Sequence, residues 1–171
     1  MALRAQLETA RLRLRPVALT DEPDFLLALN DLAVSGWLSR EAHPFTPAHF
    51  QDFAKNLAYP GEAFAVEDAS GLVGVVGAGF ELGYWFAPQV HGRGYATEAA
   101  LAVLQMQFAH DESTVTAGYF TGNTASARVL AKLGFVETGQ SLKHCRALAV
   151  DRPHVDLLLT PAAFAALHRM A

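Results

Sequence analysis

The chain has 171 residues, of which 51% are hydrophobic and 18% charged, and its formal net charge is −4 at pH 7. That length suits one domain burying roughly 70% of its unfolded surface, and the composition excludes a disordered or fibrous protein. A negative charge without runs of Lys or Arg argues against a nucleic-acid partner and mildly favours a cationic one, such as an amine.

No stretch approaches the ~20 apolar residues that a membrane helix needs, and arginines interrupt the first sixteen positions, where a signal peptide needs an apolar core. We therefore expect a cytoplasmic protein without a membrane partner. The single Cys145 excludes an internal disulfide, and no Cys or His spacing resembles a metal site, so we expect no bound metal.

The N-terminal part predicts one strand and two helices. Arginine and leucine alternate over residues 11–17, the pattern of a half-buried strand. Thr20 is predicted to cap a helix that runs to about residue 32, and an irregular loop over residues 33–46 follows. A second helix is expected to begin at Pro47, with Thr46 as its cap.

The middle of the chain predicts a strand–helix–strand unit. Two short strands over residues 63–67 and 72–77 are expected to form an antiparallel hairpin, and a third strand covers residues 81–87. From residue 95 to about 108 the apolar spacing becomes helical, and residues 114–120 form a β-branched and aromatic strand. This order is typical of a parallel βαβ unit.

The last third begins with a helix that Asn123 caps and that Gly134 is placed to end in a left-handed conformation. The elements expected after it are strands over residues 135–137, 142–150 and 155–159, and a short helix from Pro161. The predicted class is α/β (α+β) with a mixed sheet.

Residues 89–96, QVHGRGYA, leave a strand and open a helix. The first N–H groups of a helix lack intrahelical partners and carry partial positive charge, so this turn suits an anion. Gly92 and Gly94 allow positive φ and a close approach of the backbone to phosphate oxygens. We predict that the turn binds the pyrophosphate of a nucleotide-derived cofactor.

Two common cofactor motifs do not fit this turn. The dinucleotide fingerprint needs glycine or alanine where the chain has Thr97, and an acidic residue about twenty positions on. A phosphate loop needs a lysine directly after its last glycine, and Tyr95 follows Gly94. A nicotinamide or flavin enzyme that uses the turn differently is therefore disfavoured.

The arrangement Q-x-x-G-x-G resembles the cofactor motif of the GCN5-related N-acetyltransferases, the GNAT family. The likeness spans nearly the whole chain and includes ELGYWF before the turn, TEA after it, and N-x-x-S with KLGF at residues 123–135. Together these resemble the branch that acetylates the N-terminal alanine of ribosomal proteins and related amines.

The resemblance implies a single N-acetyltransferase domain over residues 1–171. It implies a mixed, mostly antiparallel seven-stranded sheet, with a central parallel strand pair splayed around the cofactor, flanked by about four helices. Acetyl-CoA would be the cosubstrate, with backbone groups of residues 84–86 reaching its pantetheine and thioester. The implied cofactor-binding residues are Trp85, Phe86, Gln89, His91, Gly92, Arg93, Gly94, Tyr95, Ala96, Asn123 and Ser126.

The resemblance also implies catalytic roles for Ser126, which would protonate or hydrogen-bond the leaving thiolate, and Glu81, which would act as a base through water. A hydroxyl bonded to its own helix and an exposed strand-end carboxylate are the structural alternatives. His154 with Asp156, which share one face of a late strand, and the histidines flanking the cofactor helix, His91 and His110, are further candidates for the base.

The expected function is acetyl transfer to a primary amine by direct attack in a ternary complex. The acceptor is either a protein N-terminus or a small-molecule amine, since the tail from Cys145 to residue 159 matches no acceptor-binding pattern. A non-catalytic acyl-CoA-binding or sensing domain is the alternative, and a homodimer is possible in either case.

Overall fold

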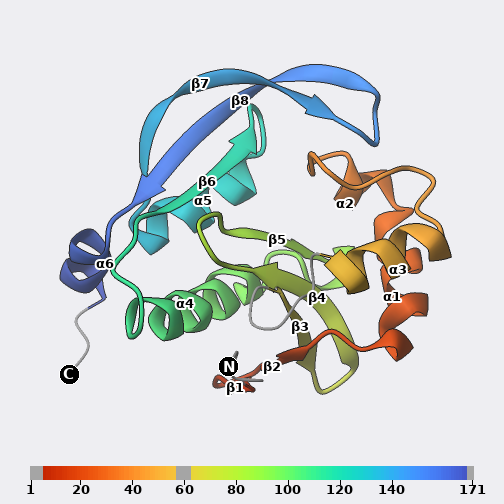
Figure 1. Ribbon diagram of the computed structural model, residues 1–171, viewed down its shortest axis with the longest axis horizontal. Coiled ribbons are helices and arrows are strands. Elements are labelled where there is room, and N and C mark those ends of the chain that lie inside the picture. Colours follow the sequence, from red (N-terminus) through yellow and green to blue (C-terminus); the bar gives the residue numbers. More distant parts are fainter. Residues whose placement is uncertain (1–5, 57–62, 169–171) are drawn as a thin grey trace.

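The computed structural model describes residues 6–56 and 63–168, and within them it has six α-helices and eight strands (Figure 1). The strands are β1 Leu7–Glu8, β2 Arg13–Pro16, β3 Ala63–Asp68, β4 Gly71–Gly77, β5 Gly83–Phe86, β6 Val115–Phe120, β7 Val136–Cys145 and β8 Val150–Leu159. The α-helices are α1 Glu22–Leu29, α2 Leu32–Ser35, α3 Pro47–Asn56, α4 Tyr95–Phe108, α5 Thr124–Leu133 and α6 Pro161–Leu167. Short 3₁₀ turns, η1 Leu19–Asp21 and η2 Pro88–Val90, precede α1 and α4.

Strands β1 to β5 form one antiparallel sheet in chain order. One of its faces packs on α4, where Ala99, Ala100, Val103 and Leu104 are fully buried. The other face packs on α1 and α3 through a separate core that includes Phe25, Phe50 and Trp85. Alternation along the strands explains the two cores, because successive side chains point to opposite faces.

Strands β6, β8 and β7 form a second, three-stranded antiparallel sheet, in that order. A single parallel bridge, Glu81↔Thr116, joins it to the first sheet just before β5. Leu82 N–H donates to the Thr116 carbonyl at 2.8 Å, and the Thr116 N–H donates to the Phe80 carbonyl at 2.7 Å. Beyond this bridge β5 pairs only with β4 and β6 only with β8 within the described residues, so the predicted splayed parallel pair is confirmed.

The prediction of one helix from Thr20 to about residue 32 was wrong. Asp21, not Thr20, precedes α1, which ends at Leu29 and is followed by the separate helix α2 inside the predicted loop. The break lies at Asn30, whose amide donates to the Leu26 and Phe45 carbonyls and accepts from the Phe45 N–H. These bonds to a distant segment replace the next turn of helix.

The tail was also partly mispredicted. Strand was expected over residues 142–150, and residues 142–145 and 150 are strand, but the chain turns at residues 146–149, between two ten-residue strands, β7 and β8, that form a long hairpin arm. Residues 146–149 lack glycine, proline, asparagine and aspartate, so the usual turn signals are missing. Ala149 instead takes a positive φ of 53°.

A partly buried ion-pair network attaches the N-terminal strand to the rest of the fold. Arg15 donates to both carboxylate oxygens of Asp21, at 2.7 and 2.9 Å, and to Glu67 at 2.8 Å. Asp21 is only 3% exposed, so its charge depends on this guanidinium. None of the described helices has the length and hydropathy to cross a membrane.

Candidate active-site cleft

A cleft of about 760 Å³ opens where β5 and β6 diverge. It is bordered by the segment after α2, by β5, by the turn before α4, by β6, and by one side of α5. His154 and Lys143 contribute to it from the β7–β8 arm. The splay of the two strands therefore produces a site whose residues come from both sheets and from helices α4 and α5.

At one end of the cleft, the predicted anion-binding turn opens helix α4. Gly92 and Gly94 have φ values of 79° and 80°, and Gly94 is the left-handed N-cap of the helix. The first helical bond in this region runs from the Glu98 N–H to the Gly94 carbonyl at 3.1 Å. The N–H groups of the first turn, from Tyr95 on, precede that bond and are available to an anion, as predicted for a helix N-terminus.

Arg11 fixes the orientation of this turn. Its Nη1 donates to the Arg93 carbonyl at 2.8 Å, its Nη2 lies 2.6 Å from Glu98, and its guanidinium stacks on the Tyr95 ring at 4.8 Å. The carbonyl and the next N–H of a trans peptide point in opposite directions. Because Arg11 holds the Arg93 carbonyl, the Gly94 N–H points away from Arg11.

Most of the predicted cofactor residues border the cleft, but Gln89 and Arg93 do not, and both are exposed. The side chains of two others have structural partners. His91 donates from Nε2 to the Phe86 carbonyl at 2.7 Å, and the Tyr95 hydroxyl donates to Asp68 at 3.0 Å. The His91 N–H also has a partner, since it donates to the Pro88 carbonyl at 3.2 Å, so of these two residues Tyr95 is the one that offers a ligand its backbone N–H.

The pairing of β5 corrects the prediction for the backbone of Trp85. Ala87 N–H donates to the Val73 carbonyl, whereas Leu82 N–H donates across the splay to Thr116. Because backbone groups alternate in direction along a strand, Trp85 pairs with β4, while Tyr84 and Phe86 face the cleft. The Trp85 side chain packs edge-on against Phe25 in the core, 5.1 Å between ring centroids.

Tyr84 and Ser126 meet across the cleft, with 2.8 Å between their hydroxyl oxygens. Burial raises the pKa of Tyr84 to about 12, although the hydrogen bond with Ser126 acts in the opposite direction. Tyr84 thus stays protonated at neutral pH. Asn123 caps α5, as predicted, by accepting from the Ser126 N–H at 3.2 Å, which leaves its amide NH₂ for another partner.

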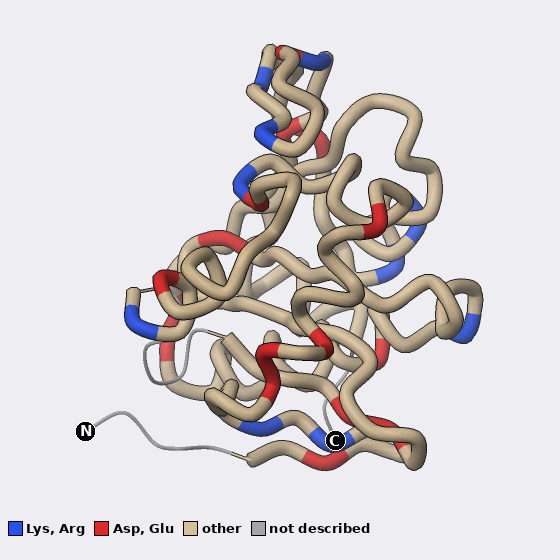
Figure 2. Tube along the Cα trace, turned by 90° about the vertical axis from the view of Figure 1, so that its right-hand side faces the viewer, with Lys and Arg blue, Asp and Glu red and all other residues tan. Residues whose placement is uncertain are grey.

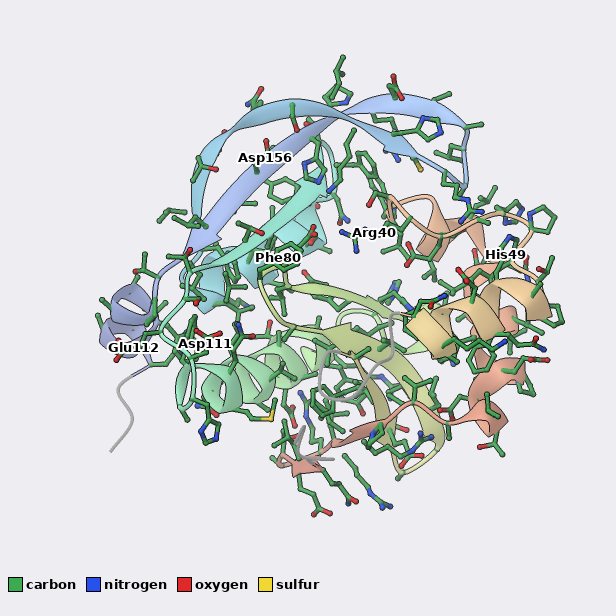
Figure 3. All side chains as sticks on the ribbon, viewed as in Figure 1. Arg40, His49, Phe80, Asp111, Glu112 and Asp156 are labelled. Carbon is green, nitrogen blue, oxygen red and sulfur yellow. The ribbon has the colours of Figure 1, made fainter. Side chains whose placement is uncertain are left out.

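Glu81 borders the cleft and is held between two cations. Its Oε2 lies 2.8 Å from Arg40 and its Oε1 lies 3.7 Å from Lys143. Figure 3 shows Arg40 pointing inward from the segment after α2, toward the part of the cleft where Phe80 lies. The predicted base is therefore part of an ion-pair cluster, which neutralises much of its charge.

Contacts between the β7–β8 arm and the segment after α2 close the other end of the cleft. Arg152 lies 4.8 Å from the ring centroids of both Trp37 and Phe120 and donates to the Gly36 carbonyl. Arg146 N–H donates to the Ser39 carbonyl at 3.2 Å. Figure 2 shows that Lys and Arg gather at the tip of this arm, in the upper part of the view.

The sequence analysis missed several charged residues of the cleft, namely Arg40, Glu41, Arg128, Lys132 and Lys143. Glu41 is partly buried, and burial raises its pKa against the effects of backbone hydrogen bonds and of Arg40 and Arg146. Arg128 and Lys132 extend from α5 and are both exposed. Their spacing of four residues predicts a common helix face, but without the third dimension nothing indicates which face borders the cleft.

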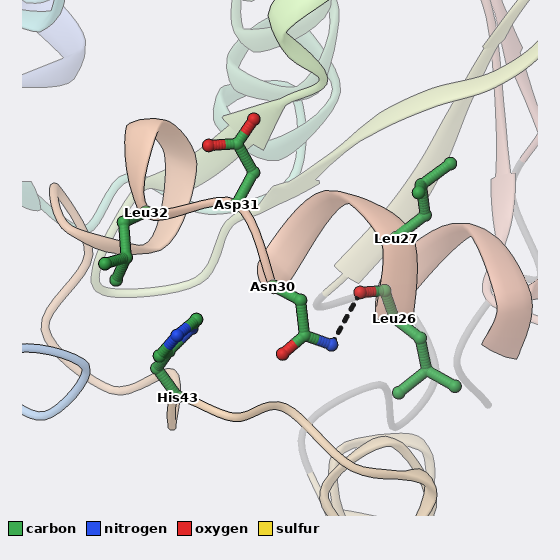
Figure 4. A pocket seen from close by; sticks show the side chains of 6 residues that line it. All are labelled: Leu26, Leu27, Asn30, Asp31, Leu32 and His43. Atoms are coloured by element: carbon green, nitrogen blue, oxygen red, sulfur yellow. Dashed lines mark hydrogen bonds between the residues drawn. The ribbon is translucent and has the colours of Figure 1, made fainter.

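A second hollow, of about 610 Å³, lies on the outer side of α1 and α2 (Figure 4). It is lined by Leu26, Leu27, Asn30, Asp31, Leu32 and His43 and contains none of the predicted site residues. His110 follows α4 and does not border the main cleft. No three His, Cys, Asp or Glu side chains of the described chain are grouped so that they could hold a metal ion.

A family model described as the acetyltransferase (GNAT) domain matches residues 11–136, a span that holds the turn, the splayed strands and α5. The chain belongs to the GNAT family. No curated protein matches it in sequence.

Solved GNAT structures share its fold. The ribosomal-protein-S5-alanine acetyltransferase of Vibrio fischeri is 20% identical, with a TM-score of 0.76 over 92% of this chain and 97% of that one. RimJ of Mycobacterium smegmatis, in complex with CoA-disulfide, is 22% identical, with a TM-score of 0.77 over 98% and 97% of the two chains. The spermidine N-acetyltransferase of Vibrio cholerae, in complex with CoA and spermine, is 18% identical, with a TM-score of 0.76 over 91% and 99%.

Proposed function

We propose that residues 1–171 form one N-acetyltransferase domain, which transfers an acetyl group from acetyl-CoA to a primary amine by direct attack in a ternary complex. The main support is one continuous cleft that joins the glycine turn at the N-terminus of α4 to the Tyr84–Ser126 hydroxyl pair. Acetyl-CoA supplies an acyl carbon and a thiolate leaving group. The remaining chemistry falls to residues of this chain.

The turn supports pyrophosphate binding in this proposal. Gly92 and Gly94 have no Cβ, and their φ values disfavour any other residue. The N–H groups that follow them give hydrogen bonds and helix-dipole energy to an anion. Arg128 and Lys132 add positive charge on the α5 side of the cleft, which suits a ligand with a further phosphate.

The reacting groups would lie between β5 and α5. The cleft-facing backbone of Tyr84 and Phe86, with the free amide of Asn123, would hold the pantetheine arm and the thioester carbonyl. Tyr84, protonated at neutral pH, can donate to Ser126, and the Ser126 hydroxyl can then donate to the thiolate. A tyrosine with a pKa of about 12 is a weak acid for a thiolate, so Tyr84 would act by orienting the Ser126 hydroxyl, which donates to the thiolate directly.

The acceptor is an amine, either a protein N-terminus or a small molecule. Structural neighbours of both kinds share the fold, since one is named for ribosomal-protein alanine and one for spermidine. An α-amine has a pKa near ~8 and a lysine-type amine near ~10.4, so the two classes need different help with deprotonation.

Two measurements test this function. CoA at about 100 times its Kd should stabilise the protein by roughly 2.7 kcal/mol in a thermal-shift assay, with NADH and ATP as control ligands. Release of free thiol from acetyl-CoA should then depend on an amine, across N-terminal peptides, polyamines, amino acids and aminoglycosides. No shift at millimolar CoA would contradict the donor, whereas a shift without turnover would favour an acyl-CoA-sensing domain.

A further inference from the structure

A histidine–aspartate pair lies on the β6–β8 side of the cleft. His154 Nδ1 is 2.8 Å from Asp156 Oδ1, and Ser141 Oγ donates to the same carboxylate oxygen at 3.2 Å. A carboxylate can only accept, so Nδ1 carries the hydrogen of the neutral imidazole. The lone pair of that ring is therefore on Nε2.

Nε2 of His154 borders the cleft. The ring lies over Gly118, where a Cβ would come within 2.7 Å of Nε2, so β6 has no side chain at this point. Nε2 makes no hydrogen bond to any described residue. Every fully buried side-chain nitrogen of the described residues has a hydrogen-bond partner, so Nε2 cannot be fully buried. It follows that Nε2 retains contact with the cleft even though His154 as a whole is 6% exposed.

The strand register defines what surrounds this ring. His154 pairs with Phe120 on β6 and with Ser141 on β7, and its neighbours on the same face of β8 are Arg152 and Asp156. Lys143, diagonally across on β7, is turned toward Glu81. The Arg152 guanidinium is held by the rings of Trp37 and Phe120. Among these charged neighbours, Asp156 is the one whose side chain contacts the His154 ring directly.

We infer that His154, oriented by Asp156, is the general base that deprotonates the acceptor amine, an assignment that rests on the proposed acetyltransferase function. His154 Nε2 takes one proton from the acceptor ammonium, and the freed nitrogen pair forms the C–N bond as the C–S bond breaks. The nitrogen then gives its second proton to the Ser126 oxygen as the Ser126 hydroxyl proton passes to the thiolate, so that of the two protons lost by the nitrogen one ends on the thiol and one on His154. His154 then returns its proton to solvent.

The other candidates fit this role less well. Glu81 is engaged by Arg40 and Lys143, which would have to move before an ammonium could reach it. His91 uses Nε2 to donate to the Phe86 carbonyl, and His110 lies outside the cleft. His154 combines a basic nitrogen at the cleft with a partner that fixes its tautomer.

The chain contains a matched control for this assignment. His144 Nδ1 also lies 2.8 Å from an aspartate oxygen, that of Asp151, but this pair is 59% and 66% exposed at the far end of the same arm. His154→Gln should lower kcat/KM for the amine about 100-fold or more and leave the Kd for CoA within about twofold. His144→Gln should change neither. Asp156→Asn should act in the same direction as His154→Gln, and because Asp156 is 43% exposed it disturbs little packing.

The pH dependence separates a base from a purely structural residue. With spermidine and an alanine-first tetrapeptide as probes, the deficit of His154→Gln should shrink by up to about tenfold per pH unit as the amine deprotonates itself. Asp156→Asn should show the same trend. A deficit that stays constant with pH, or a raised Kd for CoA, would assign His154 a structural role and overturn the inference.

A measurement without turnover completes the test. Two-bond ¹H–¹⁵N spectra of the imidazole nitrogens should show His154 protonated at Nδ1 and unprotonated at Nε2 near neutral pH, with and without CoA. An imidazolium throughout the working pH range, or a proton on Nε2 alone, would overturn the inference. If the wild type acetylates no amine, the proposed function fails, and these spectra still decide whether His154 can serve as a base.

Discussion

The Tyr84–Ser126 pair gives a quantitative test of the proposed relay to the thiolate. Ser126→Ala removes the hydroxyl that would donate to a developing anion, and a hydrogen bond to a charged group contributes about 1.5–3 kcal/mol. At about 1.4 kcal/mol per tenfold, kcat should fall by about 10- to 150-fold. Tyr84→Phe removes a bond between two neutral hydroxyls 2.8 Å apart, which contributes about 0.5–1.5 kcal/mol, so kcat should fall only about 2- to 10-fold.

The assay is thiol release at saturating acetyl-CoA, with CoA affinity measured in parallel to separate binding from chemistry. If Tyr84 acts only through Ser126, the double variant should be no slower than Ser126→Ala, since coupled residues are not additive. Tyr119→Phe is the control, because this tyrosine also borders the cleft and its hydroxyl has no hydrogen bond to the described residues. A Tyr84→Phe variant slower than Ser126→Ala would refute the order of the relay.

Three further predictions concern stability and the turn. Arg15→Met leaves the buried Asp21 carboxylate unpaired and should cost about 3–5 kcal/mol in urea unfolding, whereas Arg13→Met, at an exposed position of the same strand, should stay within about 0.5 kcal/mol. Burial raises the pKa of Glu98, but hydrogen bonds from Thr9 and Arg11 outweigh it and hold that pKa below its usual range. The stability that Glu98 contributes is therefore present above its unfolded pKa and lost as the pH falls, so wild type should lose more unfolding free energy between about pH 6 and pH 3 than Glu98→Gln; an equal loss would contradict this. Gly94→Ala meets no atom closer than 3.5 Å, yet at φ 80° it should cost about 1–2 kcal/mol and weaken CoA binding measured by calorimetry; unchanged affinity would argue against the turn as the pyrophosphate site.

The turn and its βαβ surroundings could be predicted because their signals are local. A strand that stops at a proline, two glycines, and an apolar helical spacing lie within about twenty residues, and each acts through backbone conformation. The N-cap at Asn123 and the left-handed cap at Gly134 are local in the same sense. These features determine where the donor end of the cleft lies.

The acceptor end could not be predicted, because it depends on contacts between distant segments. Arg152 meets Gly36 and Trp37 more than a hundred residues away, and Arg40 meets Glu81. The break after α1 likewise depends on Asn30 bonding to Phe45, in a stretch whose local pattern favours a longer helix. Side-chain chemistry of this kind leaves no periodic signal in the chain.

His154 is intermediate between the features with local signals and those set by distant contacts. The direction of its side chain follows from which residues of β8 are buried in the core. Val155, Leu157 and Leu159 on β8 are buried in the main core, so the even-numbered residues must face the opposite side, where His154 borders the cleft. Pro153 does not disturb this register, since β6 ends at Phe120 and only the Thr121 N–H still bonds to the Pro153 carbonyl. A slip of one residue would turn His154 away from the cleft into the apolar core and turn three apolar side chains out of that core. The packing that stabilises β8 is thus also what holds the His154–Asp156 pair at the cleft.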